Sequence, residues 1–155
     1  MSDIQKILLG AVMAIAGGIL GKVFAAFYDE WRERKFIKRA LCDELSEMES
    51  IISRFDETYQ SSNQLVPSYL TQLKANTDAY NAHRNRLFLL SSEKTRTEII
   101  KLYRDLIRNI DEHEGKLGKL STIHGKTTEQ NDIIAAFKGI KTRAETTKTK
   151  LNSWF

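Results

Sequence analysis

Cationic side chains gather in residues 115–126, a stretch rich in glycine. Its four basic or titratable residues are Lys116, Lys119, His124 and Lys126. The residues that follow, Thr127 to Gln130, have the pattern of a capping box and predict the start of a helix. Backbone donors, a helix dipole and cationic side chains together suit a phosphate group. We therefore expect a phosphate-binding site in this stretch.

A second, shorter basic cluster lies at His83-Arg84-Asn85-Arg86. Arg84 and Arg86 are the alternative phosphate ligands, and an ordinary solvated helix face is the alternative interpretation of either cluster. The formal net charge of +4 is too small to indicate binding of long nucleic acid. A compact polyanion fits better, because a symmetric oligomer repeats each small cluster around its axis.

One short motif has residues suited to catalysis. The run Arg-Asn-Ile-Asp-Glu-His that begins at Arg108 resembles the Arg-x4-His motif of the helical HEPN ribonucleases, and this resemblance implies RNA cleavage by Arg108 and His113. Three acidic neighbours would repel an RNA phosphate: Asp111, Glu112 and Glu114. We therefore predict that the chain is not an enzyme and has no catalytic residue. The spacing of its histidines predicts no metal site, and no cofactor is expected.

An apolar run opens the chain. Lys22 is the only charged residue from Ile7 to Tyr28, and these 22 residues would form a helix of roughly 33 Å, enough to cross a bilayer core. A cleaved signal peptide is the alternative, but only Lys6 precedes the run and the basic residues follow it. We predict a transmembrane helix in residues 1–28 and a cytoplasmic helical domain in residues 29–155.

The charges beside the span predict its orientation. Only Lys6 precedes it, whereas five basic residues follow it closely: Arg32, Arg34, Lys35, Lys38 and Arg39. The positive-inside bias therefore predicts an N-terminus outside and a C-terminal domain in the cytoplasm. Lys22 either snorkels to the interface or faces a pore in an oligomer.

Small residues share one side of this helix, while bulky residues such as Val12, Ile19 and Val23 share the other. The small residues are Gly10, Ala14, Gly17, Gly18, Gly21 and Ala25. Ladders of small residues four apart let two membrane helices approach closely, so we predict self-association in the membrane. The alternative is that glycine and alanine are simply common in membrane helices.

Only helices are predicted beyond the span, so the fold class is all-α. Apolar residues four and three apart extend the first helix without a breaker over residues 5–60, as one helix or two in line. We expect a loop at 61–67, a helix from about Ser68, and a third helix capped by Ser91 or Ser92 and ended by Gly115. An irregular segment at 115–126 then leads into the last helix.

The inner face of each helix can be read from this spacing. The first helix contributes Leu41, Leu45, Met48, Ile52, Phe55 and Tyr59, and the second Tyr69, Leu73, Tyr80, Leu87 and Phe88. The third contributes Ile99, Ile100, Tyr103, Leu106, Ile107 and Ile110, and the last Ile133, Ile134, Phe137, Ile140, Ala144, Leu151 and Trp154.

Charge is distributed unevenly along the chain. Residues 29–60 carry 6 basic and 9 acidic side chains, whereas residues 116–155 carry 8 basic and 3 acidic side chains. The C-terminal third is therefore the basic part.

A glycine-bearing span, a seam helix and a small helical domain with basic clusters together resemble the membrane-bound ancillary effectors of CRISPR systems, in particular the Vibrio-type type III effectors. This resemblance of architecture implies a homotetramer or larger ring in the bacterial inner membrane. It implies that the cytoplasmic domain binds cyclic tetra-adenylate and that the ring opens or disrupts the membrane in antiviral defence, but it assigns no individual ligand-binding residue. The alternatives are a membrane-tethered HEPN-type ribonuclease or pore of type VI systems, and a passive anchored coiled-coil adaptor.

Overall fold

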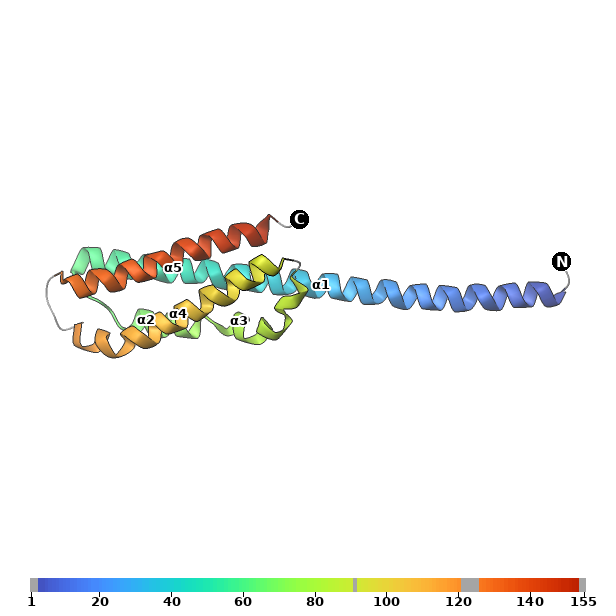
Figure 1. The fold of residues 1–155 in the computed structure, drawn as a ribbon, viewed down its shortest axis with the longest axis horizontal. Coiled ribbons are helices and arrows are strands. Elements are labelled where there is room, and N and C mark those ends of the chain that lie inside the picture. The colour runs from blue at the N-terminus through green and yellow to red at the C-terminus, as the bar shows by residue number, and fades with distance from the viewer. Residues whose placement is uncertain (1–2, 91, 121–125, 154–155) are drawn as a thin grey trace. The chain divides into compact units, whose positions relative to one another are not determined.

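The computed structural model describes residues 3–90, 92–120 and 126–153, and this part of the chain contains helices and no strand (Figure 1). In chain order the elements are α1 (Asp3–Ser62), α2 (Ser68–Ala75), α3 (Asp78–His83), the 3-10 helix η1 (Arg84–Leu89), α4 (Glu93–Leu120) and α5 (Thr128–Asn152). The predicted all-α fold class is confirmed. Of the two alternatives predicted for residues 5–60, one helix or two in line, the structure has the single helix, which ends two residues later than expected.

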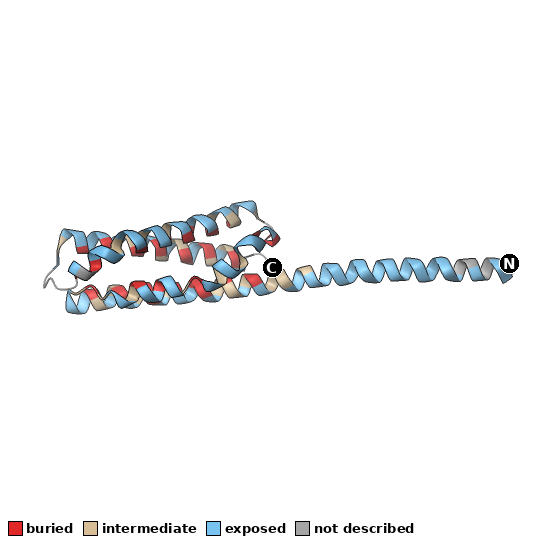
Figure 2. Cartoon of the chain, turned by 90° about the horizontal axis from the view of Figure 1, so that it is seen from below, coloured by how far each residue is buried: buried red, intermediate tan, exposed pale blue. Residues whose placement is uncertain are grey.

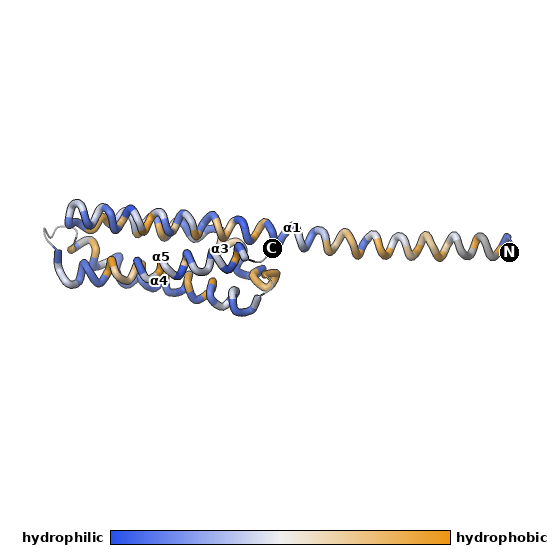
Figure 3. Tube along the Cα trace, turned by 90° about the horizontal axis from the view of Figure 1, so that it is seen from above, coloured by the Kyte–Doolittle hydropathy of each residue, from blue (hydrophilic) through white to orange (hydrophobic). Residues whose placement is uncertain are grey.

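The chain divides into two structural units. The first ends at Phe36 and the second begins at Ile37, so α1 contributes residues to both. In the first unit, residues 10–29 are exposed throughout and are pale blue in Figure 2. Their large apolar side chains include Ile15, 63% exposed, and Ile19, 58% exposed. In Figure 3 the tube of the same segment alternates between orange and pale stretches, with little of the strong blue that marks hydrophilic residues. Among the described residues, α1 is the one helix that is long and apolar enough to cross a membrane.

The second unit is an up-and-down bundle of four roughly antiparallel segments, which we call its legs. They are α1 from Ile37 onward, the segment from α2 to η1, α4, and α5 (Figure 1). The predicted apolar seam of α1 lies in its core, since every seam residue from Leu41 to Tyr59 is at most 1% exposed. Phe55 contacts Phe137 of α5 edge-on, with 5.9 Å between ring centroids, and Tyr69 at 5.5 Å. Within one chain, the seam therefore packs against the other legs of its own bundle.

The second leg is not the single helix predicted from Ser68. Helix α2 ends at Ala75 because Asn76 leaves the helical conformation, with ψ at 47°, and its side-chain amide donates a hydrogen bond to the backbone carbonyl oxygen of Glu44 (2.9 Å). The chain then turns into α3 and η1. Phe88, which was expected inside, is 66% exposed.

Helix α4 begins as predicted but ends later. The side-chain oxygen of Ser92 accepts a hydrogen bond from the backbone N–H of Thr95 (3.2 Å), whereas Ser91 lies outside the described residues. Gly115 does not end the helix, which continues to Leu120 because Leu117 and Leu120 are buried at 0% and 6% exposure. Burying two leucines gains about 3–6 kcal/mol, more than the roughly 1 kcal/mol cost of an interior glycine.

The buried stripe of α4 is shifted around the helix from the stripe that the sequence indicated. Ile100 and Ile107 are 36% and 40% exposed, whereas Leu102 is fully buried. Helix α5 starts at the predicted capping box, with Thr127 as its N-cap. The predicted inner residues of α5 from Ile133 to Leu151 are buried, and Trp154 lies outside the described residues.

Candidate functional site

Lys116 and Lys119 lie near the end of α4 and not in the irregular segment predicted for them. Both residues are exposed. A cation near the C-terminal end of a helix interacts favourably with the helix dipole, so both lysines have a structural reason to be there without a ligand. His124, the third member of the predicted cluster, lies outside the described residues.

Lys126, the last member of that cluster, is held against the end of α1. Its ammonium group donates a hydrogen bond to the side-chain oxygen of Gln60 (2.9 Å). The same group lies 5.7 Å from the ring centroid of Tyr59, within the range of a cation–π interaction. The residue is nevertheless exposed, so its ammonium could also meet an anion from solution.

The start of α5 already has protein partners. The Thr127 side chain accepts a hydrogen bond from the backbone N–H of Gln130 (3.2 Å), and the Gln130 side chain accepts one from the backbone N–H of Thr127 (2.9 Å). The first turn also carries Glu129. A phosphate at this helix start would therefore meet backbone donors that are partly used by the capping box, and a carboxylate that repels it. The backbone N–H groups thus contribute less to phosphate binding than the sequence predicted.

Arg84 and Arg86 are exposed on η1, just before α4. The 28 residues of α4 span about 42 Å, and Lys116 and Lys119 lie at the far end of that helix (Figure 1). One subunit therefore cannot bring both predicted clusters to the same small ligand. They are separate candidate sites.

Much of the positive charge of α5 is paired inside the bundle. Ammonium and guanidinium groups of α5 contact acids of α1 and α4 in four pairs: Lys138–Asp56 (2.9 Å), Arg143–Asp105 (2.7 Å), Lys148–Glu49, and Lys150–Glu98 (2.7 Å). The hydrogen bond from Arg143 holds the pKa of Asp105 below its usual value. Burial raises the pKa of Asp56, but hydrogen bonds from Lys138 and Gln60 outweigh it, so this pKa is also lowered. The charge asymmetry of the sequence thus reflects, in part, contacts between helices.

Arg108 and His113 point in different directions from α4, because residues five apart are separated by about 140° around a helix. Arg108 is exposed and its guanidinium lies 3.3 Å from the carboxylate of Asp105. The ring of His113 lies edge-on to Phe137, 6.3 Å between centroids, and its Nδ1 is buried without a hydrogen-bond partner. Within one subunit, these two side chains do not converge on a common space.

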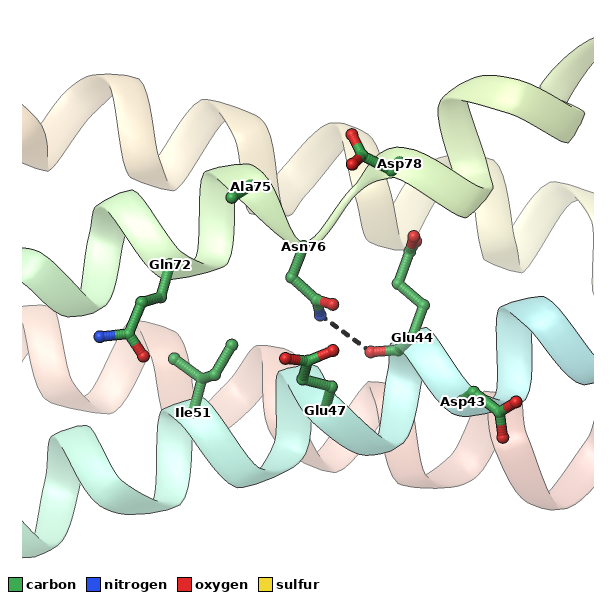
Figure 4. Close-up of a pocket in the computed structure, with 8 residues that line it drawn as sticks. All are labelled: Asp43, Glu44, Glu47, Ile51, Gln72, Ala75, Asn76 and Asp78. Atoms are coloured by element: carbon green, nitrogen blue, oxygen red, sulfur yellow. Dashed lines mark hydrogen bonds between the residues drawn. The ribbon is translucent and has the colours of Figure 1, made fainter.

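An acidic cleft of about 450 Å³ lies between α1 and the α2–α3 segment (Figure 4). Its polar lining comprises four carboxylates and two amides: Asp43, Glu44, Glu47, Asp78, Gln72 and Asn76. The cleft would repel a phosphate. No group of three or more His, Cys, Asp or Glu side chains in the described part of the chain is placed to hold a metal ion. Sequence reasoning missed this cleft, although the excess of acids in residues 29–60 was the available signal.

Glu44 ties the α2–α3 segment to α1. The residue is 6% exposed, and its carboxylate accepts hydrogen bonds from the backbone N–H groups of Ala79 (2.6 Å) and Tyr80 (3.3 Å) at the start of α3. Burial raises the pKa of Glu44. Burial and the Glu44 carboxylate also raise the pKa of the Tyr103 hydroxyl, whose ring stacks on Tyr80 with 4.1 Å between centroids. This cluster fixes the path of the second leg.

Glu44→Gln should change the pH dependence of folding. The pKa of Glu44 is higher in the folded state than its ordinary value of 4.5, so the folded state holds the proton more tightly than the unfolded state. The wild type should therefore lose stability relative to the glutamine variant as the pH rises through the window above 4.5, by about 1.4 kcal/mol for each unit of upward shift. Thermal unfolding of the detergent-solubilised full chain at a series of pH values would measure this difference.

Glu44→Ala provides the comparison for that experiment. Alanine leaves the backbone N–H groups of Ala79 and Tyr80 without their acceptor, so this variant should be less stable than the wild type at every pH. Parallel stability curves for wild type and Glu44→Gln would contradict the assigned shift.

The small side of the first unit is a candidate assembly surface. Its six predicted residues, from Gly10 to Ala25, are all exposed. A Cβ atom built on Gly10, Gly17, Gly18 or Gly21 would meet no atom of another part of the chain within 4 Å. Each helical glycine costs about 0.5–1 kcal/mol relative to alanine. Within the chain, no steric contact therefore explains these glycines.

These features define a class: an all-α protein in which one exposed apolar helix, suited by length and composition to crossing a membrane, continues into a helix that belongs to a compact bundle. No family model, curated protein or solved structure matches the chain.

Proposed function

We propose that this protein is an oligomeric single-span effector of the bacterial inner membrane, with its N-terminus outside and its helical bundle in the cytoplasm. The bundle binds a cyclic oligonucleotide such as cyclic tetra-adenylate, and the assembled N-terminal helices open or disrupt the membrane in antiviral defence. One observation carries the proposal. The apolar side chains of the first unit are exposed, and the small residues among them share one side of the helix.

Three lysines at one end of the bundle support the ligand part of the proposal. At this end, Lys116 and Lys119 lie in the last turns of α4, and Lys126 lies just before α5. All three are exposed. A symmetric ring would repeat them in every subunit and create a positive rim for a ligand with several phosphates.

Binding of cyclic tetra-adenylate should weaken as the salt concentration rises, because each phosphate contact is screened and releases counterions. Lys119→Ala or Lys126→Ala should weaken it several-fold or more, since symmetry repeats each loss in every subunit. Calorimetric titration of the detergent-solubilised full chain, at low and at high salt, would measure both effects. Loss of the ligand-induced rise in melting temperature would be a second readout.

Lys94→Ala is the matched control. It removes the same charge from an exposed position of α4 that lies about 38 Å from Lys119 along the helix. Lys148 of α5 would be a poorer control, because replacing it would also break its ion pair with Glu49. Equal affinities for all these variants would exclude this end of the bundle and transfer the proposal to Arg84 and Arg86.

The two alternative functions predict different results in assays of RNA cleavage, ligand binding and vesicle permeabilisation. RNA cleavage by the purified protein that disappears when Arg108 and His113 are both replaced by alanine would establish a ribonuclease. A stable oligomer that binds no cyclic oligonucleotide and never permeabilises vesicles would establish a passive adaptor. Either result would overturn the effector proposal.

A further inference from the structure

Residues 28–36 of α1, which begin at Tyr28 where the apolar run ends, divide their side chains between two sides of the helix. At about 100° per residue, one arc of about 140° carries both unpaired cations and all the aromatic rings of this segment. These residues, the basic–aromatic face, are Tyr28, Trp31, Arg32, Lys35 and Phe36. The remaining arc carries every acid of the segment together with one arginine: Asp29, Glu30, Glu33 and Arg34.

Contacts within the segment keep the two sides chemically distinct. On the acidic side, the guanidinium of Arg34 pairs with the carboxylate of Glu30 at 2.5 Å. On the other side, the ammonium of Lys35 lies 5.0 Å from the ring centroid of Trp31. Arg32 has no ion-pair partner among the residues that the structure describes. The basic–aromatic face therefore keeps its positive charge available.

The aromatic rings of this face are also open to the surroundings. Tyr28 is 60% exposed, Trp31 is 44% exposed and Phe36 is 62% exposed. The rings of Tyr28 and Trp31 lie 6.1 Å apart, so they form one continuous amphipathic surface with the Lys35 ammonium above it. Tyrosine and tryptophan favour the headgroup level of a membrane, where one end of the ring is apolar and the other is wet.

We propose that the basic–aromatic face binds the phosphate groups of anionic phospholipids in the leaflet that α1 leaves. Residues 28–36 rise about 13 Å beyond the apolar run, and the headgroup region is several ångströms thick, so their long cationic side chains can snorkel back to lipid phosphates. Basic side chains near an anionic surface are attracted to it, whereas the acidic arc is repelled and turns away. The inference rests on the proposed membrane span, and it adds a lipid preference and a rotational orientation of the helix.

Fluorescence quenching of Trp31 would test this proposal. The full chain with Trp154→Phe retains one tryptophan, and it would be reconstituted into vesicles of mixed phosphatidylcholine and phosphatidylglycerol. In one preparation only the phosphatidylglycerol carries bromine, and in the other only the phosphatidylcholine does. We expect stronger quenching by the brominated anionic lipid, because that lipid is enriched around the basic–aromatic face.

Arg32→Gln and Arg34→Gln form a matched pair, since both remove one guanidinium and lie two residues apart on different sides of the helix. Arg32→Gln should reduce the preference for phosphatidylglycerol by up to about five-fold, and Arg34→Gln should leave it nearly unchanged. Equal quenching by both lipids in the parent protein, or equal effects of the two variants, would overturn the inference while the span stands. Quenching by neither lipid would overturn the span and the inference together.

Discussion

Replacing Gly17 and Gly21 together by leucine should dissociate the membrane oligomer and abolish permeabilisation of vesicles, while the protein still inserts. Two leucines on the small side would separate helices that pack through their backbones. The chain itself would tolerate them, because the space around both glycines is open. Native mass spectrometry in detergent would report the oligomer, and dye leakage from vesicles would report the activity.

Ala16→Leu with Ala26→Leu is the control for that experiment. Both alanines are exposed and lie on the bulky side of the same helix, so the same two leucine side chains point away from the proposed contact, at a gain in volume one methyl group smaller for each residue. This variant should remain oligomeric and active. An oligomer of unchanged size in the glycine variant would exclude the small side as the assembly surface.

Phe137→Ala should destabilise the bundle by about 3–5 kcal/mol, the usual cost of removing a buried aromatic ring. Phe137 is fully buried, contacts Phe55 edge-on and lies beside the ring of His113. Because domains of ordinary size are stable by only about 5–15 kcal/mol, the loss is a large fraction of the total. Chemical denaturation of the detergent-solubilised chain, followed by near-ultraviolet circular dichroism, would measure it.

Phe88→Ala makes the same chemical change at an exposed position, where the side chain is 66% exposed. Its effect should stay within about 0.5 kcal/mol. Comparable losses for the two variants would contradict the assignment of Phe137 to the core and of Phe88 to the surface.

Local patterns predicted the parts of the fold that depend on neighbouring residues. The spacing from Leu41 to Tyr59 predicted a continuous helix with a buried seam, because residues three and four apart share one helix face. The motif from Thr127 to Gln130 predicted the start of α5, because both of its hydrogen bonds join residues three apart. The apolar run from Ile7 predicted a helix suited to a membrane, because length and hydropathy are properties of a segment.

The tertiary structure decided the features that depend on distant partners. The sequence predicted one helix from Ser68, but hydrogen bonds to Glu44 from Asn76 and from the start of α3 interrupt it. Glu44 lies 32 residues before Asn76, and the residues next to Asn76 give no sign of this distant partner. Gly115 predicted a helix end, but the burial of Leu117 and Leu120 against other legs of the bundle outweighs the glycine.

The charged residues of the candidate site show the same difference between what the sequence determines and what the packing decides. The sequence by itself determined that the C-terminal third is basic and that residues 29–60 are acidic. Only the packing of α5 decided that Lys138, Arg143 and Lys150 meet acids of α1 and α4, and that Lys116 and Lys119 lie on a helix. The physical reason is that an ion pair depends on distance in space, and the ion-paired residues of these helices, which lie 38 to 99 positions apart in the chain, become neighbours only when the helices pack.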